Sequence, residues 1–382
     1  MLTCSLQLYL HKLLYITSGG KKIMIYLDNA ATTRPDDVVL DIYKQTQHNA
    51  FYNSESLHSG GDHVDYLLRD CRNYLKSYFD TEKEVIFTRS GSHGNEIAIQ
   101  SYLTYSARSK ILVSPFEHPS IFAALESFKD QFTIVFTPLN DEGEIDINQT
   151  QALLNGDIAL IIMQHVNSET GYILPVDTIA KYAEQYCIPI HVDGVQAVNK
   201  LPNIDISMFT SYTFSSHKFH GTKGVGALLI SHEYVKPLNS HYFHEQSTQN
   251  GTLDTPSIVA MTKALSMTID LKYMTQLKTH ALKRAQALNF SHIRFNKESS
   301  HILALLSPKF EAQYIMQSLS SRNICISTGT ACGHGMLLSE GLQVKINTIA
   351  HDALDQYMRL SFSKNNTIAD IDSCFNHLAM II

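Results

Sequence analysis

Short apolar runs alternate with segments of helical pattern between residues 84 and 230, and this alternation restricts the possible folds more than any other feature of the chain. Several runs are nearly continuous in Val, Ile and Leu, as expected of strands that are covered on both faces. The apolar runs are 85–88, 110–114, 132–138, 158–165, 189–193, 209–214 and 225–230, and the helical segments are 95–105, 120–129, 148–154 and 176–186. This order predicts an α/β domain built on a mostly parallel, doubly wound sheet, in which ligands bind beyond the carboxyl ends of the strands.

The segments on either side of this region have a different organisation. Further helices are expected at 36–47, 62–79 and 257–288, and from residue 368 to the end. We expect a large domain over residues 36–249 and a smaller α+β domain that combines residues 24–35 with 250–382. In this division the N-terminal segment returns to the C-terminal part of the chain.

Residues 1–23 are expected to be a non-native or disordered N-terminal extension. The sequence Gly-Gly-Lys-Lys at 19–22 closely precedes Met24. Codons for these four residues can form a purine-rich ribosome-binding site just upstream of a start codon. We therefore expect that translation begins at Met24.

Composition argues against several classes of function. The chain has 382 residues, of which 44% are hydrophobic and 17% charged, so it is long enough for a large core and two domains. Its net charge of −6 gives no basic surface for nucleic acid or for an anionic membrane. Its six cysteines include no C-x-x-C pair, which argues against a zinc site and a disulfide scaffold and fits a reducing cytoplasm. We expect a cytoplasmic protein with no metal, no direct nucleic-acid contact and no membrane span.

One lysine lies in a turn of small residues between two predicted strands. The turn at 213–224 reads T-F-S-S-H-K-F-H-G-T-K-G and contains Lys218. A lysine that is buried at such a place has a lowered pKa and can act as a nucleophile towards carbonyl groups. The hydroxyl side chains and backbone N–H groups around it would suit a phosphate, so the turn suggests pyridoxal 5'-phosphate (PLP) held as a Schiff base. The alternative, which the turn alone does not exclude, is a surface lysine on a glycine-rich loop.

Other polar residues also follow predicted strands. Asp193 ends an apolar run, and a buried carboxylate there could pair with a protonated pyridinium nitrogen and keep the ring an electron sink. His118 follows another run and could lie flat over an aromatic ring, while the turn at 90–94 could hold a phosphate at a helix N-terminus. The alternatives are a helix-capping aspartate, a structural histidine and a plain strand-to-helix turn.

Two candidates lie in the C-terminal part. Cys332 belongs to the Gly-rich stretch S-T-G-T-A-C-G-H-G, where a cysteine would be exposed on a mobile loop and could react as a thiolate. The alternative is a buried spacer. Arg359 lies in a predicted strand and, if it points inward, needs a carboxylate partner. That partner could be the α-carboxylate of an amino acid, bound through two hydrogen bonds, or the side chain of a structural salt bridge.

Together these residues resemble the class V aminotransferase family of PLP-dependent enzymes, and within it the NifS-like cysteine desulfurases. The resemblance extends from Tyr26 to about Asp372. It rests on YLDNAATT at 26–33, E-H at 117–118, HVNSETG at 165–171, HVDGVQ at 191–196, SSHK at 215–218, GT at 251–252, STGTAC at 327–332 and the strand with Arg359. It implies PLP fold type I, with a large domain around a seven-stranded, mostly parallel sheet and a smaller α+β domain.

The resemblance assigns cofactor-binding roles position by position. Lys218 would form the Schiff base with PLP, Asp193 would pair with the pyridine nitrogen, and Gln196 would contact the ring hydroxyl. His118 would stack on the ring and would be catalytic together with Lys218. The residues expected to hold the phosphate are Gly91, Ser92, Ser215 and His217. Thr252 would reach the phosphate in the neighbouring subunit, which implies a homodimer with shared active sites.

The resemblance also implies the reaction. L-cysteine would be converted to L-alanine, and its sulfur would be left as a persulfide on Cys332, the third catalytic residue. Arg359 would bind the substrate carboxylate, with Asn167 and Ser168 beside the substrate. The sulfur would then pass to an acceptor protein, for tRNA thiolation or iron–sulfur cluster assembly.

The chain departs from the family pattern in four motifs, one of which contains both His93 and Glu96. Ser168 stands where a second asparagine is common, and His93 where a glutamate is common. Glu96 replaces a common asparagine, Gln249 replaces an arginine before the dimer contact, and Gly-His-Gly follows Cys332 in place of a Ser-rich run. The alternatives are therefore a selenocysteine lyase or β-lyase of the same family, or a diverged relative that binds PLP with weak or no turnover.

Overall fold

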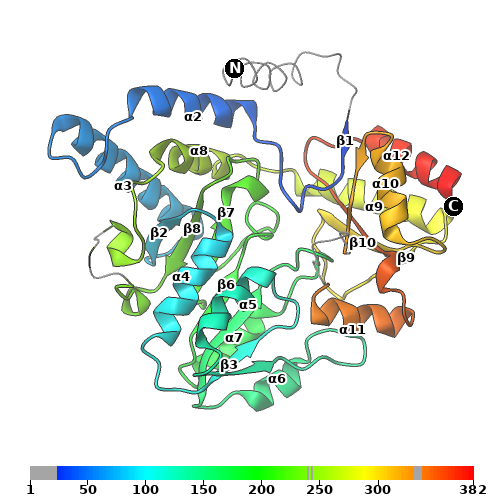
Figure 1. Ribbon diagram of the computed structural model, residues 1–382, viewed down its shortest axis with the longest axis horizontal. Helices are drawn as coiled ribbons and strands as arrows, with labels where there is room; N and C mark the ends of the chain where they lie inside the picture. The colour runs from blue at the N-terminus through cyan, green and yellow to red at the C-terminus, as the bar shows by residue number, and fades with distance from the viewer. Residues whose placement is uncertain (1–23, 239–240, 242–243, 330–337) are drawn as a thin grey trace, which may run out of the picture.

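A seven-stranded sheet forms the centre of the protein in the computed structural model, which describes residues 24–238, 241, 244–329 and 338–382 (Figure 1). The strands lie in the order β2 (Glu84–Thr88), β8 (Gly226–Ile230), β7 (Ser211–Ser215), β6 (Ile190–Asp193), β5 (Ile158–Gln164), β3 (Lys110–Val113) and β4 (Thr133–Phe136). Strand β8 runs antiparallel to both its neighbours, and every other neighbouring pair is parallel. The predicted α/β class with a seven-stranded, mostly parallel sheet is confirmed.

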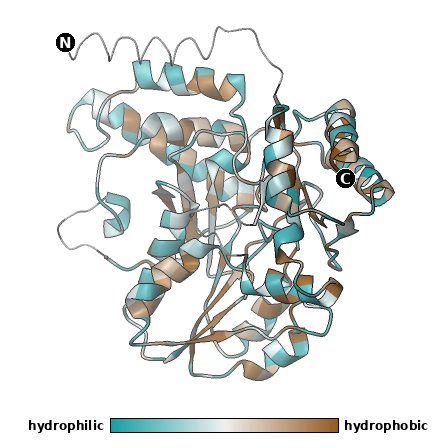
Figure 2. Ribbon diagram, turned by 45° about the vertical axis from the view of Figure 1, so that its right-hand side comes forward, coloured by the Kyte–Doolittle hydropathy of each residue, from teal (hydrophilic) through white to brown (hydrophobic). Residues whose placement is uncertain are grey.

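Side chains alternate between two apolar layers, one on each face of this sheet. Ile86 packs with helices α4 (Gly91–Leu103) and α5 (Pro119–Leu125), whereas its neighbour Phe87 packs with α3 (Ser59–Phe79) and the helices beside it. Because successive side chains of a strand point to opposite faces, these nearly continuous apolar strands supply both layers at once. Figure 2 shows the strands as a brown, hydrophobic centre surrounded by helices with teal, polar faces.

The remaining helices surround the sheet and the C-terminal part. They are α2 (Asp37–Asn49), α6 (Ile147–Leu153), α7 (Val176–Glu184), α8 (Thr255–Leu265), α9 (Leu271–Ala287), α10 (Ala312–Ser320), α11 (Glu340–Ile349) and α12 (Ile368–Ile381). Five short 3-10 turns occur among the described residues: η1 (Glu126–Phe128), η2 (Ser216–Lys218), η3 (His232–Tyr234), η4 (His244–Ser247) and η5 (Leu354–Gln356).

The C-terminal part has its own small sheets. Four antiparallel strands lie in the order β12 (Ser327–Thr328), β13 (Tyr357–Ser361), β10 (Ile302–Leu306) and β9 (Ser291–His292). They share an apolar core with α9, α10 and α12. Strand β1 (Ile25–Tyr26) pairs in parallel with β11 (Ile324–Cys325), and Leu27 belongs to the same core, so the N-terminal segment lies against the C-terminal part. Helix α8, in contrast, contributes to the core of the large sheet, and the boundary at residue 250 stays a prediction.

Two predicted helix boundaries were wrong. The single helix expected over 257–288 is two helices, because α8 ends at Leu265 and α9 begins at Leu271. Asp270 starts the second helix by accepting hydrogen bonds from the backbone N–H groups of Lys272 and Tyr273. The turn expected at 90–94 is itself the first turn of α4, which begins at Gly91 and not at residue 95.

Among the residues that the structure describes, no helix combines the length and the apolar character that a membrane crossing needs. The predicted extension, residues 1–23, lies outside the described residues.

Candidate active site

A cavity of about 210 Å³ lies beyond the carboxyl ends of β5, β6 and β7. Nine of the residues singled out from the sequence line it: Gly91, Ser92, His118, Ser168, Asp193, Gln196, Ser215, His217 and Lys218. Parallel strands bring their carboxyl ends to one edge of a sheet, so residues that are far apart in the chain meet there. The candidate residues therefore lie beyond the carboxyl ends of the strands, where the sequence predicted them.

Lys218 ends the short turn η2 and lies at the wall of this cavity. Its Nζ donates hydrogen bonds to the carbonyl oxygens of Ala30 at 2.7 Å and Ala31 at 3.0 Å. Burial, together with the positive charge of Arg359, lowers the pKa of Lys218 to about 8, against the opposing effect of Asp193 and Asp28. A substantial fraction of this amine is therefore neutral, and so nucleophilic, near neutral pH.

Asp193 ends β6 and is held from two sides. Its Oδ1 accepts a hydrogen bond from the backbone N–H of Val195, and its Oδ2 accepts one from Nδ2 of Asn95, both at 2.9 Å. Its exposed fraction is only 6%. Burial raises the pKa of the neighbouring Glu117 well above its usual value, and the nearby Asp193 raises it further. Asp193 therefore presents a carboxyl group held by two hydrogen bonds to the cavity.

His118 is the N-cap of α5 and faces the same cavity. Its Nδ1 accepts a hydrogen bond from the backbone N–H of Ser120 at 3.1 Å. Burial lowers the pKa of His118, and Lys218 contributes to the lowering, while Asp193 opposes it. A neutral imidazole at this place suits the predicted stacking on an aromatic ring.

The part of the cavity wall formed by Gly91 and Ser215 is suited to a phosphate. Helix α4 begins there at Gly91, and a Cβ on this residue would lie 2.5 Å from Cγ2 of Val195, so only glycine lets the two segments approach this closely. The backbone N–H groups of a helix N-terminus favour an anion. Ser215 has a buried Oγ with no hydrogen-bond partner in the described structure, and it lines the same cavity. An amine, a carboxylate, a neutral imidazole and this anion-binding end together fit PLP.

Gln196 is held by a second buried lysine. Its Oε1 accepts a hydrogen bond from Nζ of Lys200 at 2.8 Å, and its Nε2 donates to the carbonyl oxygen of Ala30 at 2.7 Å. Burial lowers the pKa of Lys200 well below its usual value, and the positive charge of Lys218 adds to the lowering. The contact of Gln196 with a cofactor hydroxyl stays a prediction.

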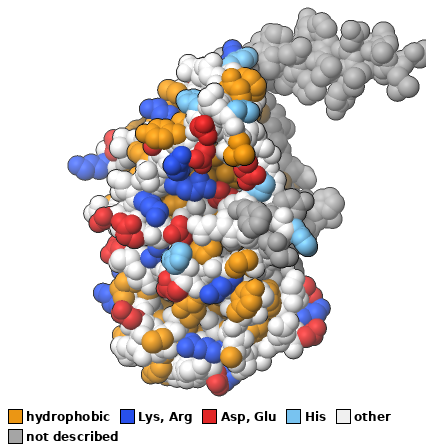
Figure 3. Space-filling view, turned by 90° about the vertical axis from the view of Figure 1, so that its left-hand side faces the viewer, with side chains coloured by type: hydrophobic (Ala, Val, Ile, Leu, Met, Phe, Trp, Pro, Cys, Tyr) orange, Lys and Arg blue, Asp and Glu red, His pale blue; other side chains and the backbone are white. Residues whose placement is uncertain are grey.

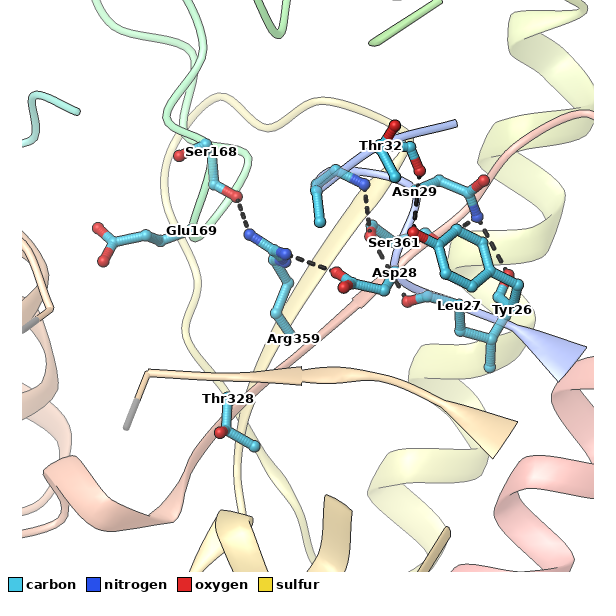
Figure 4. Close-up of polar contacts among 12 residues, drawn as sticks. Tyr26, Leu27, Asp28, Asn29, Thr32, Ser168, Glu169, Thr328, Arg359 and Ser361 are labelled. Atoms are coloured by element: carbon cyan, nitrogen blue, oxygen red, sulfur yellow. Dashed lines mark hydrogen bonds and ion pairs between the residues drawn. The ribbon is translucent and has the colours of Figure 1, made fainter. Parts of the chain in front are cut away.

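Arg359 lies close to the cavity but is not among its lining residues. Figure 4 shows its guanidinium group between the backbone of Ser168 and the side chain of Asp28. Nη1 donates to the carbonyl oxygen of Ser168 at 2.8 Å, and Nη2 donates to Oδ1 of Asp28 at 2.6 Å. Nε is buried without a hydrogen-bond partner in the described structure. The arginine therefore keeps donor capacity, although one carboxylate already binds it.

Besides Arg359, three further predicted site residues are not brought into the cavity by the described structure. Asn167 is buried, and its side chain binds the backbone of Phe116 and the N–H groups of Glu169 and Thr170. Thr252 is exposed in the segment before α8. Cys332 lies outside the described residues. The substrate contact of Asn167, the intersubunit role of Thr252 and the catalytic role of Cys332 stay predictions.

Sequence reasoning missed three polar residues around this site. They are Asp28, which pairs with Arg359, Asn95, which binds Asp193, and Lys200, which binds Gln196. Asp28 lies within the motif YLDNAATT, and Lys200 lies four residues after Gln196, the spacing of one helical turn. These two signals were available in the sequence, whereas nothing local connects Asn95 to Asp193.

The chain matches known proteins over nearly its whole length. Residues 25–374 match the model of the family described as aminotransferase class V. Cysteine desulfurase 2 of Trichormus variabilis is 30% identical over 94% of this chain and 93% of its own, and a cysteine desulfurase of Nostoc is 28% identical with the same coverage. A solved NifS-like protein, 22% identical, superposes with a TM-score of 0.86 over 94% of this chain and 99% of its own, which shows the same fold. The chain is therefore a PLP-dependent enzyme of the aminotransferase class V family, similar over nearly its whole length to NifS-like cysteine desulfurases.

Proposed function

We propose that this protein is a cysteine desulfurase, which converts L-cysteine to L-alanine and leaves the sulfur as a persulfide on Cys332. The observation that carries the proposal is the position of Lys218, a half-buried amine whose pKa is lowered to about 8, at the wall of the cavity that Asp193 and His118 also line. The similarity to cysteine desulfurases over 94% of the chain supports it.

The reaction is balanced by the chain's own groups. The C–S bond of L-cysteine breaks and an S–S bond forms with the Cys332 thiolate, so the substrate carbon is reduced as the two sulfur atoms are oxidised. PLP, when bound, supplies the electron sink that lets the proton at the substrate Cα leave. Neutral Lys218 is the base that accepts this proton and returns one to the product. The charge of Asp193 keeps the pyridine nitrogen protonated.

The substrate carboxylate is expected to bind Arg359. Its Nε carries no partner among the described residues, and its two terminal nitrogens each bind only one acceptor in the described structure. Ser168, whose carbonyl oxygen holds Nη1, lines the cavity and so connects the arginine to the space where the substrate would lie. A guanidinium group with several remaining donors can still bind a second carboxylate.

The experiment that tests the proposal mixes purified protein with PLP and L-cysteine under a reductant and quantifies alanine and sulfide. Equimolar alanine and sulfide from the wild type, with neither from Cys332→Ala, would support both the reaction and the nucleophile. Cys187→Ala, which removes an exposed thiol elsewhere, is the matched control and should keep full activity. A wild type that binds PLP but yields no alanine would refute the proposal.

A homodimer with shared active sites is part of this proposal. Large hydrophobic side chains are exposed on α2, on the loop after it and on α3: Val38, Leu40, Phe51, Leu57 and Tyr66. Figure 3 looks onto the face that includes these elements, where hydrophobic side chains lie among charged ones. Exposed apolar surface of this kind favours contact with another protein surface. The family pattern predicts that a second copy would contribute its Thr252 to the phosphate end of the cavity.

The product sulfur needs an acceptor protein in the cytoplasm. A persulfide is a carrier, because its outer sulfur passes readily to another thiolate. We propose that the acceptor is a scaffold for iron–sulfur cluster assembly or an enzyme that thiolates tRNA. Incubating the enzyme with labelled cysteine and each purified acceptor would show which one receives the label.

A second candidate function is a diverged family member with weak or no cysteine desulfurase activity. The ion pair between Arg359 and Asp28 favours it, because a carboxylate of the chain already binds the expected substrate arginine. So does His93, which binds Arg89 through its ring and has a pKa that burial lowers to about 4, where the family commonly has a glutamate. A selenocysteine lyase or β-lyase would be distinguished by full turnover of its substrate in the Cys332→Ala variant.

A further inference from the structure

A row of buried hydrogen bonds leads from Asp193 through Asn95, which also lines the cavity, to His191 and Ser211. Oδ2 of Asp193 bonds to Nδ2 of Asn95 at 2.9 Å, Oδ1 of Asn95 to Nε2 of His191 at 3.0 Å, and Nδ1 of His191 to Oγ of Ser211 at 2.8 Å. Asn95 is 1% exposed, and both His191 and Ser211 are 0% exposed. Three elements that are distant in sequence, α4, β6 and β7, therefore meet in one polar row within an apolar core.

The direction of every bond in this row is fixed by the carboxylate at its end. Because Asp193 can only accept, the amide NH2 of Asn95 must face it, and the amide oxygen must face His191. His191 then has to donate through Nε2 and accept the hydroxyl hydrogen of Ser211 at Nδ1. This arrangement requires a neutral imidazole, and burial lowers the pKa of His191 to about 3, which agrees with it.

The row determines how the carboxylate of Asp193 is oriented. The Val195 N–H holds one carboxylate oxygen and Asn95 holds the other, so the group cannot rotate without losing a hydrogen bond. An unpaired donor or acceptor at this depth would cost the full desolvation of that group. Asn95 itself cannot turn its amide over, because its amide oxygen would then face the carboxylate of Asp193. The orientation of Asp193 is therefore imposed from β7 and α4 as well as from its own strand.

We propose that Asn95, anchored by its hydrogen bond to His191, is a positioning residue that aims the Asp193 carboxylate at the protonated pyridine nitrogen of PLP. Asn95 acts through Asp193 and needs no role in the chemistry of the substrate. The inference rests on the proposed function only through the contact between Asp193 and PLP, and it does not depend on which substrate the enzyme turns over.

The test measures PLP binding to the apoenzyme by absorbance titration, independently of turnover. Asn95→Leu keeps the side-chain size and removes the hydrogen bonds to Asp193, His191 and Ser120. We expect the Kd for PLP to rise about 10- to 100-fold, because the bond to the Asp193 carboxylate is lost. The absorbance maximum of bound PLP should shift as well, because it reports the protonation of the pyridine ring. Gln100→Leu, an amide-to-apolar change on the outer part of the same helix, is the control and should leave both values unchanged.

A second pair of variants tests the row if Asn95→Leu does not fold. His191→Leu removes the donor to Asn95 and should weaken PLP binding, whereas His191→Gln keeps an amide donor and should restore much of it. If His191 were merely structural, both variants would have a lower thermal midpoint of unfolding. Their PLP affinities and the spectra of bound PLP would then not differ from each other. The inference is overturned if folded Asn95→Leu, or folded His191→Leu, binds PLP within twofold of the wild type and with an unchanged spectrum. A wild type that binds PLP but forms no alanine would refute the proposed function and leave this inference standing.

Discussion

Arg359 and Asp28 are 331 positions apart and form an ion pair in which Nη2 lies 2.6 Å from Oδ1. The pair connects β13 to the N-terminal segment just after β1. Both side chains are largely buried, with exposed fractions of 11% and 21%. The arginine that is expected to recognise a substrate carboxylate is therefore already bound to one.

Asp28→Asn is predicted to lower the KM for L-cysteine several-fold. The amide keeps an oxygen that can accept from Arg359, so the arginine should keep its position, while the competing negative charge disappears. Steady-state alanine production over a range of cysteine concentrations measures the effect. Asp37→Asn, at an exposed partner of Arg34, is the control. A raised KM would mean that Asp28 positions Arg359 for the substrate and does not compete with it.

The reaction of the apoenzyme with PLP is predicted to depend on pH through Lys218. Only the neutral amine attacks the aldehyde, and burial lowers its pKa to about 8, so the rate should rise about tenfold per pH unit below pH 8 and level off above it. Arg359→Met removes a positive charge that lowers this pKa, so the midpoint should move to higher pH. Stopped-flow absorbance measures the rate. The same profile in the wild type and Arg359→Met would contradict the electrostatic coupling, and exposed Arg294→Met serves as control.

Much of this site follows from where the predicted strands end. Lys218 and Asp193 were predictable because each follows an apolar run, and parallel strands bring such ends together. Asn95 was not, because its role depends on how α4 crosses the sheet towards β6, which no local pattern encodes. The sequence also did not decide which carboxylate binds Arg359. A substrate and an acidic side chain of the chain both carry this group, and no local pattern distinguishes them.

The same limit applies to the helices. The apolar pattern continues through residues 257–288, so periodicity predicted one helix, and only the capping hydrogen bonds of Asp270 show where a second one starts. An aspartate before a helical segment is a local signal for a helix start, and Asp270 is such a residue. Here the apolar pattern continues across residues 266–270 and predicts one uninterrupted helix instead.

Gly91→Ala is predicted to weaken PLP binding. The new Cβ would lie 2.5 Å from Cγ2 of Val195, so the first turn of α4 or the segment after Asp193 has to move, at a cost of about 1–3 kcal/mol. Gly91→Ala combined with Val195→Ala removes the clash and should recover much of the affinity. Absorbance titration with PLP measures both variants. Gly156→Ala, where nothing lies within 4 Å of the new Cβ, is the control. Equal losses in the single and double variants would show that the clash is not the cause.

Glu245→Ala is predicted to lower the free energy of unfolding by about 3 kcal/mol. The carboxylate of Glu245 is buried, pairs with Arg72 of α3, and accepts the backbone N–H of Phe87 on the edge strand β2 at 2.6 Å. Its removal leaves a partly buried guanidinium and a strand N–H without their partner. Glu245, Gln246 and Ser247 all have positive φ, so this contact also holds a strained segment that leads towards Thr252.

Chemical denaturation of Glu245→Ala, followed by circular dichroism, measures this loss. The matched control is Arg69→Ala, which breaks the exposed pair with Asp65 on the same helix. Both of its partners are about half exposed or more, so its loss should change the free energy of unfolding by less than about 1 kcal/mol. Similar values for the two variants would mean that burial of the Glu245 carboxylate does not determine the strength of its pair, and that water reaches Arg72 when its partner is absent.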